Sequence, residues 1–402
     1  MTKRWIKTIS LLSTVALLAG CLSDLDSEVV ESTIAPDQVV VETVTNQLSS
    51  DNYKAVITDG RYQLGVGASD NSNLSSAGNI LAFEEGLLRI SHATFPTDQY
   101  LLREGLIIDE ETMSRWLARE STANPEGLNP ALANNESETN NDQTTGETSE
   151  ETTTSAENTQ VIVDTTSTPI YLSQVMEKNI MVETEDGYQL AGVMLGLAMN
   201  SVYQYTDEEG VSYQQEISLG EMRERGRSYA NIIVGRLRNT EALRNVPIVV
   251  GLFRQAPNNE IAGGTYVMYG ISREGNYIAD WTELNEYRVS LPIISSANYA
   301  EQYEFFDNFS NQVSNFFPNL NGISGEALYV NNNLSSLTIE IVTQFYQQTE
   351  ITALTQHVTD MAAVHLPTGI PIEISITSAH GPEAIISRQA GSENYFSHIY
   401  QQ

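Results

Sequence analysis

Residues 190–205 read LAGVMLGLAMNSVYQY, an apolar run with glycines at positions 192 and 196 that predicts a buried β-strand. Downstream of this run, strand and helix signals alternate. Residues 220–240 have helical spacing of apolar side chains, and residues 246–253 and 266–271 are typical of strands. This alternation predicts an α+β fold. The short gaps between several strand pairs favour a mixed, partly antiparallel sheet with helices packed on it.

The last hundred residues continue the pattern. Phe305, Phe309, Val313 and Phe316 recur at helical spacing and predict a helix over 301–317 with these side chains on its buried face. Strand signals at 327–330 and 337–342 flank three asparagines and predict a hairpin. A helix over 349–363 is expected before three further strands. Residues 166–402 are therefore predicted to form one C-terminal α+β domain.

The preceding part of the chain predicts a smaller α+β domain over residues 51–130. Residues 53–58 have strand character, and Asp59-Gly60 predicts a hairpin turn to residues 61–64. Helices are expected over 83–91 and 110–119. Residues 134–164 then contain eight acidic residues and no basic one, too polar to form a core. Residues 131–165 are therefore predicted to be a disordered acidic linker.

The charge balance excludes several partners. The chain has 402 residues, with 20 Lys and Arg against 52 Asp and Glu, and a net charge of −32. Such a surface repels phosphate backbones and anionic headgroups, so nucleic acid is not an expected partner. One cysteine cannot form an internal disulfide, so stability must come from a packed core.

That cysteine, Cys21, follows an N-terminal segment typical of a secretory signal. Three basic residues precede a short apolar run, and Leu18-Ala19-Gly20-Cys21 is similar to the lipobox of bacterial lipoproteins. Residues 1–20 are predicted to be a signal peptide, with signal peptidase recognising Leu18, Ala19 and Gly20. Cys21 then carries diacylglycerol, whose two acyl chains suffice for stable anchoring. We expect lipoprotein-processing enzymes as partners and a cell-membrane location facing the extracellular side. Removal of the three basic residues brings the net charge to about −35, and residues 21–50 are predicted to be an acidic tether.

Enzyme signatures are missing from the sequence. The five histidines lack His-Glu-x-x-His spacing, no Gly-x-Ser-x-Gly occurs, and acidic clusters such as 207–209 lack the EF-hand pattern. We therefore expect no metal, no cofactor and no catalytic residues. The helix over 220–240 carries Arg223, Arg225 and Arg227, which form either a solvated face paired with nearby carboxylates or an anion-binding site.

Several sequence blocks occur in an order that resembles the CamS family, the sex-pheromone-precursor lipoproteins of Gram-positive bacteria. The blocks are EGLLRIS at 85–91, FPTDQYL at 95–101, GLNP at 127–130, YLS at 171–173, GLAMNSVY at 196–203, RLR at 236–238 and HIY at 398–400. They extend from residue 85 to the end of the chain.

The resemblance implies a second use for the signal peptide. In that family, a fragment released with the signal is trimmed to a short apolar peptide that induces plasmid conjugation. The matching residues here are Ser13, Thr14, Val15, Ala16, Leu17, Leu18, Ala19 and Gly20. Family peptides carry an Ile-Phe-Ile core where this segment has Val-Ala-Leu, so a spent signal segment is the alternative interpretation.

The resemblance assigns no chemistry to the mature domain. We expect a non-catalytic binding or adhesion module for an unknown extracellular ligand or protein. The alternative is an extracellular hydrolase acting on a cell-envelope substrate. A deep polar cleft holding a nucleophile within hydrogen-bond reach of a histidine would favour the hydrolase, and a shallow surface would favour the binding module.

Overall fold

The computed structural model describes residues 41–43, 48–58, 60–66, 73–132, 167–185, 187–207, 209–293, 301–316 and 320–400. All of them belong to one unit of the chain, residues 40–402. The predicted signal peptide with Cys21, most of the predicted tether, and all but the first two residues of the predicted linker lie outside the described residues.

The first sheet has eight strands in the order β1-β2-β3-β4-β5-β8-β9-β10. Strands β2 and β3, and strands β5 and β8, pair in parallel, and the other neighbours are antiparallel. The strands are β1 (Val41–Thr43), β2 (Lys54–Thr58), β3 (Leu101–Glu104), β4 (Leu172–Thr184), β5 (Gly187–Met199), β8 (Ile248–Arg254), β9 (Thr265–Ser272) and β10 (Trp281–Glu283).

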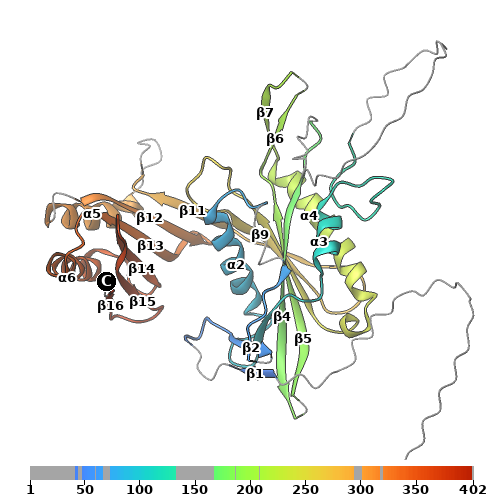
Figure 1. Ribbon diagram of the computed structural model, residues 1–402, viewed down its shortest axis with the longest axis horizontal. Coiled ribbons are helices and arrows are strands. Elements are labelled where there is room, and N and C mark those ends of the chain that lie inside the picture. Colours follow the sequence, from blue (N-terminus) through green and yellow to red (C-terminus); the bar gives the residue numbers. More distant parts are fainter. Residues whose placement is uncertain are drawn as a thin grey trace, which may run out of the picture. The chain divides into compact units, whose positions relative to one another are not determined.

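Helices cover both faces of this sheet (Figure 1). Helix α2 (Ala77–Ser91) packs on one face, while α3 (Glu110–Leu117) and α4 (Leu219–Arg238) pack on the other. A short helix, η1 (Glu241–Leu243), follows α4. Because both faces are covered, β5 is apolar at consecutive positions: Leu195 and Leu197 face the α3 and α4 side, and Met194 and Ala198 face α2.

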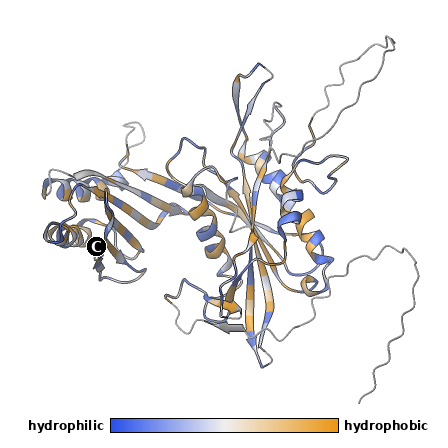
Figure 2. Cartoon of the chain, viewed as in Figure 1, coloured by the Kyte–Doolittle hydropathy of each residue, from blue (hydrophilic) through white to orange (hydrophobic). Residues whose placement is uncertain are grey.

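The glycines of β5 leave room for aromatic rings on the α2 face. A Cβ atom at Gly196 would lie 2.7 Å from both the Phe83 ring and the Tyr266 hydroxyl, and one at Gly192 would lie 2.3 Å from the Phe95 ring. The predicted buried strand over 190–205 is confirmed up to Met199, where β5 ends at the centre of a three-layer arrangement, whereas residues 202–205 belong to the next strand. Beyond β5, strands β6 (Val202–Thr206) and β7 (Ser212–Glu216) form a separate two-stranded ribbon that is largely hydrophilic (Figure 2).

The second sheet has six strands in the order β11-β12-β13-β14-β15-β16. All neighbours are antiparallel except β13 and β14, which helix α6 connects. Helices α5 and α6 supply the core on one face of this sheet. The elements are β11 (Glu286–Leu291), η2 (Glu301–Tyr303), α5 (Glu304–Phe316), β12 (Leu320–Val330), β13 (Asn333–Thr343), α6 (Gln348–His365), β14 (Ile372–Ser378), β15 (Gly381–Arg388) and β16 (Phe396–Ile399).

The predicted α+β class with mixed, partly antiparallel sheets is confirmed. The predicted hairpin around three asparagines is also confirmed, because Asn331 and Asn332 adopt positive φ angles of 52° and 64° between β12 and β13. In α5 the predicted buried face is displaced by one residue at its start. Phe306, Phe309 and Val313 are buried, whereas Phe316 is 51% exposed and stacks on His357.

Two sequence predictions differ from the structure. Strand β2 does not form a hairpin with residues 61–64. It pairs instead with β1 and β3. The strands of the predicted 51–130 domain also do not form a sheet of their own, because β3 pairs with β4 across the predicted linker. The second large sheet begins only at β11. Within the described residues, no helix is both long and apolar enough to cross a membrane.

Candidate functional site

A cavity of about 770 Å³ lies at the edge of the first sheet where β5 ends and β4 begins. Strands β5 and β8 are parallel, so Asn200 and Gln255, which directly follow them, lie at the same edge. Ligands of open α/β sheets bind characteristically beside the carboxyl ends of such strands. The topology therefore places this cavity where a binding site is expected.

The cavity exists because β3 covers only part of its neighbour. Strand β3 pairs with residues 178–181 of the 13-residue β4, which leaves the first half of β4 without a strand on the side away from β5. Side-chain groups cap that edge instead. The Asn129 carboxamide accepts from the backbone N–H groups of Tyr171 and Leu172 at 2.8 and 2.9 Å and donates to the Leu172 carbonyl at 2.9 Å.

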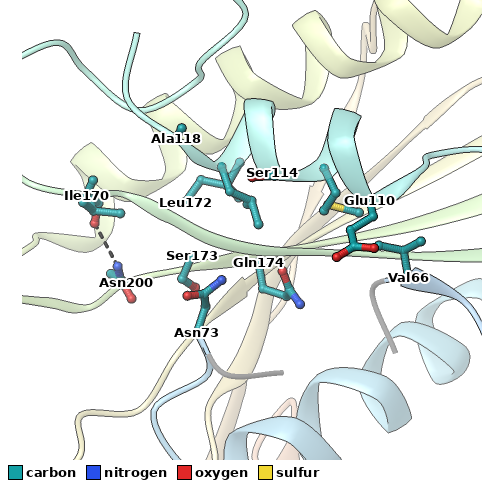
Figure 3. A pocket seen from close by; sticks show the side chains of 12 residues that line it. Val66, Asn73, Glu110, Ser114, Ala118, Ile170, Leu172, Ser173, Gln174 and Asn200 are labelled. Carbon is teal, nitrogen blue, oxygen red and sulfur yellow. Dashed lines mark hydrogen bonds between the residues drawn. The ribbon is translucent and has the colours of Figure 1, made fainter. Parts of the chain in front are cut away.

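Figure 3 shows how the side chains converge on this cavity. Asn73, Ser173 and Gln174 cluster on one side of β4, while Leu172 and the α3 residue Ser114 lie on the other. A register shift between Leu172 and Gln174 interrupts the pairing with β5 at Ser173. Such bulges commonly redirect side chains next to functional sites. The remaining lining residues are Val66, Glu110, Met113, Leu117, Ala118, Ile170 and Asn200.

A second cavity of about 370 Å³ adjoins the first, since both are lined by Ile170 and Asn200. We call the two cavities together the amide groove. The second cavity is also lined by Ser75, Ser201, Val202, Tyr203, Gln204, Gln214, Gln255, Ala256, Pro257, Asn258 and Asn259. Across both cavities the described lining includes eight side-chain amides, and Glu110 is its only charged residue.

Gln255 organises the floor of the amide groove. Its side chain is 2% exposed and donates from Nε2 to Ser173 Oγ at 2.5 Å and to Asn200 Oδ1 at 3.0 Å. Its Oε1 accepts from the Ser75 backbone N–H at 3.0 Å. Both ends of the carboxamide are therefore engaged, and the amide holds three separate chain segments in a fixed geometry.

Buried Asn79 continues this network into helix α2. Its Oδ1 accepts from the backbone N–H groups of Ala256 and Gly264 at 3.0 and 2.8 Å. Its Nδ2 donates to Ser75 Oγ at 2.6 Å and to the Ala256 carbonyl at 3.1 Å. The loop after β8, which carries the groove residues Asn258 and Asn259, is thereby fixed to the start of α2.

The hydroxyl at the centre of the groove is not arranged as a nucleophile. Ser173 Oγ donates to the Ala198 carbonyl at 3.0 Å and accepts from Gln255. A serine nucleophile needs a base on its proton, and here that proton is held by a backbone carbonyl. None of the five histidines, all of which lie in described segments, lines the amide groove.

The three predicted anion-binding arginines have different surroundings in the structure. Arg223 Nη1 lies 3.3 Å from Glu283 Oε2, and its Nη2 donates to the Val267 carbonyl. Arg225 lies 5.0 Å over the ring of Tyr171, whose hydroxyl donates to Glu221. Burial, and then that hydrogen bond, raise the pKa of Tyr171. Arg227 is exposed. An anion site at these residues remains a prediction.

The acidic clusters serve as local caps. Asp109 accepts from the Thr112 backbone N–H at 2.7 Å at the start of α3, and these bonds to Thr112 lower the pKa of Asp109. Asp207 accepts from the N–H groups of Glu209 and Val211 in the β6–β7 turn. Within the described ranges, no group of three or more His, Cys, Asp and Glu is placed to hold a metal ion.

The amide groove was not predicted from the sequence. Gln255 follows the predicted strand over 246–253, but Asn200 lies inside the predicted strand over 190–205, so the sequence did not place the two side chains at neighbouring strand ends. Parallel pairing of β5 with β8 could not be read from local periodicity. Single asparagines and glutamines are also common on surfaces, so their type alone gave no indication.

Comparison with known proteins identifies the family of the chain. The family model described as "CamS sex pheromone cAM373 precursor" matches residues 65–394. A sex pheromone precursor from Lactobacillus salivarius subsp. salivarius UCC118 has a similar crystal structure, with 33% identity, a TM-score of 0.75, and coverage of 90% of this chain and 99% of that one. The C-terminal domain of the sex pheromone staph-cAM373 precursor from Staphylococcus aureus matches at 26% identity with a TM-score of 0.62, covering 82% and 99% of the two chains. No curated protein matches. The predicted resemblance is confirmed, and the chain belongs to the CamS family of sex pheromone precursors.

Proposed function

We propose that the mature chain is a non-catalytic extracellular binding module, anchored to the membrane through Cys21, that takes its ligand in the amide groove. The observation that carries this proposal is the Gln255 network. It joins Ser173 of β4, Asn200 directly after β5 and the Ser75 backbone N–H before α2, in fixed positions around a cavity at the carboxyl ends of parallel strands. Preorganised polar groups beside an apolar wall are characteristic of ligand sites.

The hydrolase alternative has less support in the groove. Acyl or glycosyl transfer requires a nucleophile next to a base, or two carboxylates facing the substrate. The described lining offers Ser173, whose proton is held by a carbonyl, and a single carboxylate, Glu110. A binding role uses the donors and acceptors as they are arranged.

Retention on the cell envelope tests the binding proposal. The mature chain with Cys21→Ser, which lacks the lipid, would be incubated with isolated, lipid-free Gram-positive cell walls. We expect it to be retained, and we expect the double variant Gln204→Ala/Gln214→Ala to be retained at least tenfold less. Both glutamines are exposed and line the groove, so their loss should leave the fold intact.

The matched control is Gln215→Ala on the same ribbon. Gln215 pairs with Tyr203 and therefore projects from the opposite face to Gln204 and Gln214, and it lines neither cavity. Equal retention of all three proteins would contradict binding through the groove. Absence of retention of the starting protein would contradict the module itself.

Anchoring through Cys21 is tested separately in cells. With the natural sequence, we expect radiolabelled fatty acid to be incorporated and the protein to fractionate with membranes. Cys21→Ala should abolish both, and Ala19→Lys, which places a bulky charge before the cleavage position, should leave uncleaved precursor. Membrane association of Cys21→Ala equal to that of the natural sequence would contradict the lipid anchor.

The family membership supports a precursor role for the signal peptide. Two similar structures are named as sex pheromone precursors, and the corresponding segment here comprises residues 13–20. A synthetic peptide of these eight residues should induce conjugation in responder cells, whereas a scrambled peptide of the same composition should not. Equal responses to the two peptides, or none to either at any dose, would contradict signalling by this segment.

A further inference from the structure

The lining of the amide groove indicates which chemical class of ligand it takes. On a chain with a net charge of −32, the described groove residues include a single charged side chain, Glu110. An anionic ligand would find no cationic partner there and would be repelled by the overall charge. A cationic ligand would find one exposed carboxylate. The groove therefore favours an uncharged polar ligand.

The polar groups match hydroxyl chemistry. A carboxamide offers two N–H donors and one carbonyl acceptor, and a hydroxyl offers one donor and two acceptor positions. A sugar ring presents hydroxyls that also donate and accept. Five of the eight amides of the lining are exposed, those of Asn73, Gln204, Gln214, Asn258 and Asn259, and they supply mixed donors and acceptors around the groove, as a polyhydroxylated ligand requires.

The apolar wall matches the other surface of a sugar. Met113 and Leu117 of α3 line the first cavity together with Ile170 and Leu172. Figure 3 shows Leu172 on the side of β4 opposite to the cluster of Asn73, Ser173 and Gln174. Pyranose rings have C–H faces bounded by hydroxyl edges. A sugar ligand lying across the uncovered edge of β4 would meet apolar side chains on the α3 side of the strand and the polar cluster on its other side.

A peptide ligand fits this arrangement less well. Extended peptides commonly bind by adding a strand to an exposed sheet edge. The uncovered first half of β4 does not offer such an edge, because Asn129 bonds the backbone at Tyr171 and Leu172, and Gly105 donates to the Glu177 carbonyl at 3.1 Å. Recognition in the groove falls to side chains from separate elements.

From these observations we propose that the amide groove binds a neutral oligosaccharide, with at least one sugar unit in each of its two cavities. This proposal rests on the binding function proposed above and names its ligand. Asn200, which lines both cavities, donates to the Ile170 carbonyl at 2.9 Å and accepts from Gln255, so its amide is fixed at the junction between neighbouring sugar units.

Calorimetric titration of the lipid-free mature chain tests the ligand class. The probes are chitotetraose and maltotetraose as neutral glycans, a hyaluronan oligosaccharide as an anionic glycan, and a blocked, uncharged octapeptide. We expect a neutral tetrasaccharide to bind, with at least a tenfold higher Kd for Gln204→Ala/Gln214→Ala and for Asn258→Ala/Asn259→Ala, and an unchanged Kd for Gln215→Ala. Thermal melts confirm that each variant is folded.

The outcomes separate the ligand proposal from the binding proposal. Groove-dependent retention on cell walls without binding of either neutral tetrasaccharide would overturn the glycan assignment and leave the binding module in place. Groove-dependent binding of the octapeptide or hyaluronan alone would overturn it in the same way. If the starting protein itself is not retained on cell walls, both the binding proposal and the glycan proposal are overturned. Tighter binding of chitotetraose than of maltotetraose would further assign the site to N-acetylated sugars.

Discussion

The side chains of Asn200 and Gln255, the first residues after two parallel strands, hydrogen bond to each other at 3.0 Å. The backbone repeats the connection, since the Gln255 N–H donates to the Met199 carbonyl at 2.9 Å. The ends of the neighbouring strands β5 and β8 are thus joined to each other at the cavity that we assign to ligand binding. The same contacts that shape the groove should therefore also stabilise the fold.

Replacing Gln255 with alanine should destabilise the protein substantially. The change removes one of the two hydrogen bonds of buried Ser173, the donor to half-buried Asn200 Oδ1, and the acceptor of the Ser75 N–H. Each unsatisfied buried group costs about 1–3 kcal/mol, and because the bonds share one side chain we expect a total of about 2–4 kcal/mol. Urea denaturation measures this loss. Gln214→Ala, at an exposed groove position, should stay within about 0.5 kcal/mol of the natural protein, and an equal effect of the two changes would contradict the network.

Much of the fold was predictable because its signals are local. Residues 193–199 of the apolar run are buried on both faces, and the asparagines at 331–333 mark a turn because asparagine tolerates positive φ. The partners of the strands were less accessible. Strand β3 joins β4 across some 70 residues of chain, and nothing in residues 101–104 specifies a partner so distant.

The candidate site was less predictable than the fold for the same reason. Its residues come from the start of α2, from α3, and from the ends of β4, β5 and β8. Only the parallel pairing of β5 and β8 brings Asn200 and Gln255 within hydrogen-bonding distance. Arg223 and Arg225 stand out in the sequence because basic residues are rare on this chain. In the structure, however, Arg223 contacts Glu283 and Arg225 lies over the ring of Tyr171.

Gly86→Ala should destabilise the protein although alanine is the better helix former. A Cβ atom at Gly86 in α2 would lie 2.5 Å from the ring of Tyr266, which is fully enclosed against the sheet. Overpacking of this kind costs about 1–3 kcal/mol and exceeds the gain of about 1 kcal/mol in helix propensity. Gly235→Ala in α4 is the control, because its nearest neighbour is 3.6 Å away, and it should stabilise the protein. Chemical denaturation that gave the two changes the same sign would contradict the close packing of Tyr266.

His92→Phe should change how stability depends on pH. Burial, assisted by the charge of Arg89, lowers the pKa of His92 below its usual value of 6.5, and Asp51 only partly opposes the shift. A group with a lowered folded-state pKa favours the folded state while it is neutral in both states. That contribution is present above pH 6.5 and is lost as the pH falls through the folded-state pKa. The natural protein should therefore lose more thermal stability than His92→Phe between pH 6.5 and pH 5. An equal loss of melting temperature in the two proteins between these pH values would contradict the lowered pKa of His92.

Lys178 and Glu104 should show strong energetic coupling. Lys178 is 1% exposed, and its Nζ lies 2.7 Å from Glu104 and 2.6 Å from Glu84, while Tyr62 also donates to Glu104. Lys178→Met leaves the buried Glu104 carboxylate without its cation, and removing one member of a buried pair costs about 3–5 kcal/mol. In Lys178→Met/Glu104→Gln no uncompensated charge remains at these positions, so the double change should cost about 1–3 kcal/mol less than the sum of the single changes.

A denaturant-based double-mutant cycle measures this coupling. The exposed pair Arg115–Glu111 provides the comparison, with an expected coupling below about 1 kcal/mol. Additive effects at 178 and 104 within about 0.5 kcal/mol would mean that Glu104 does not depend on Lys178 for its burial.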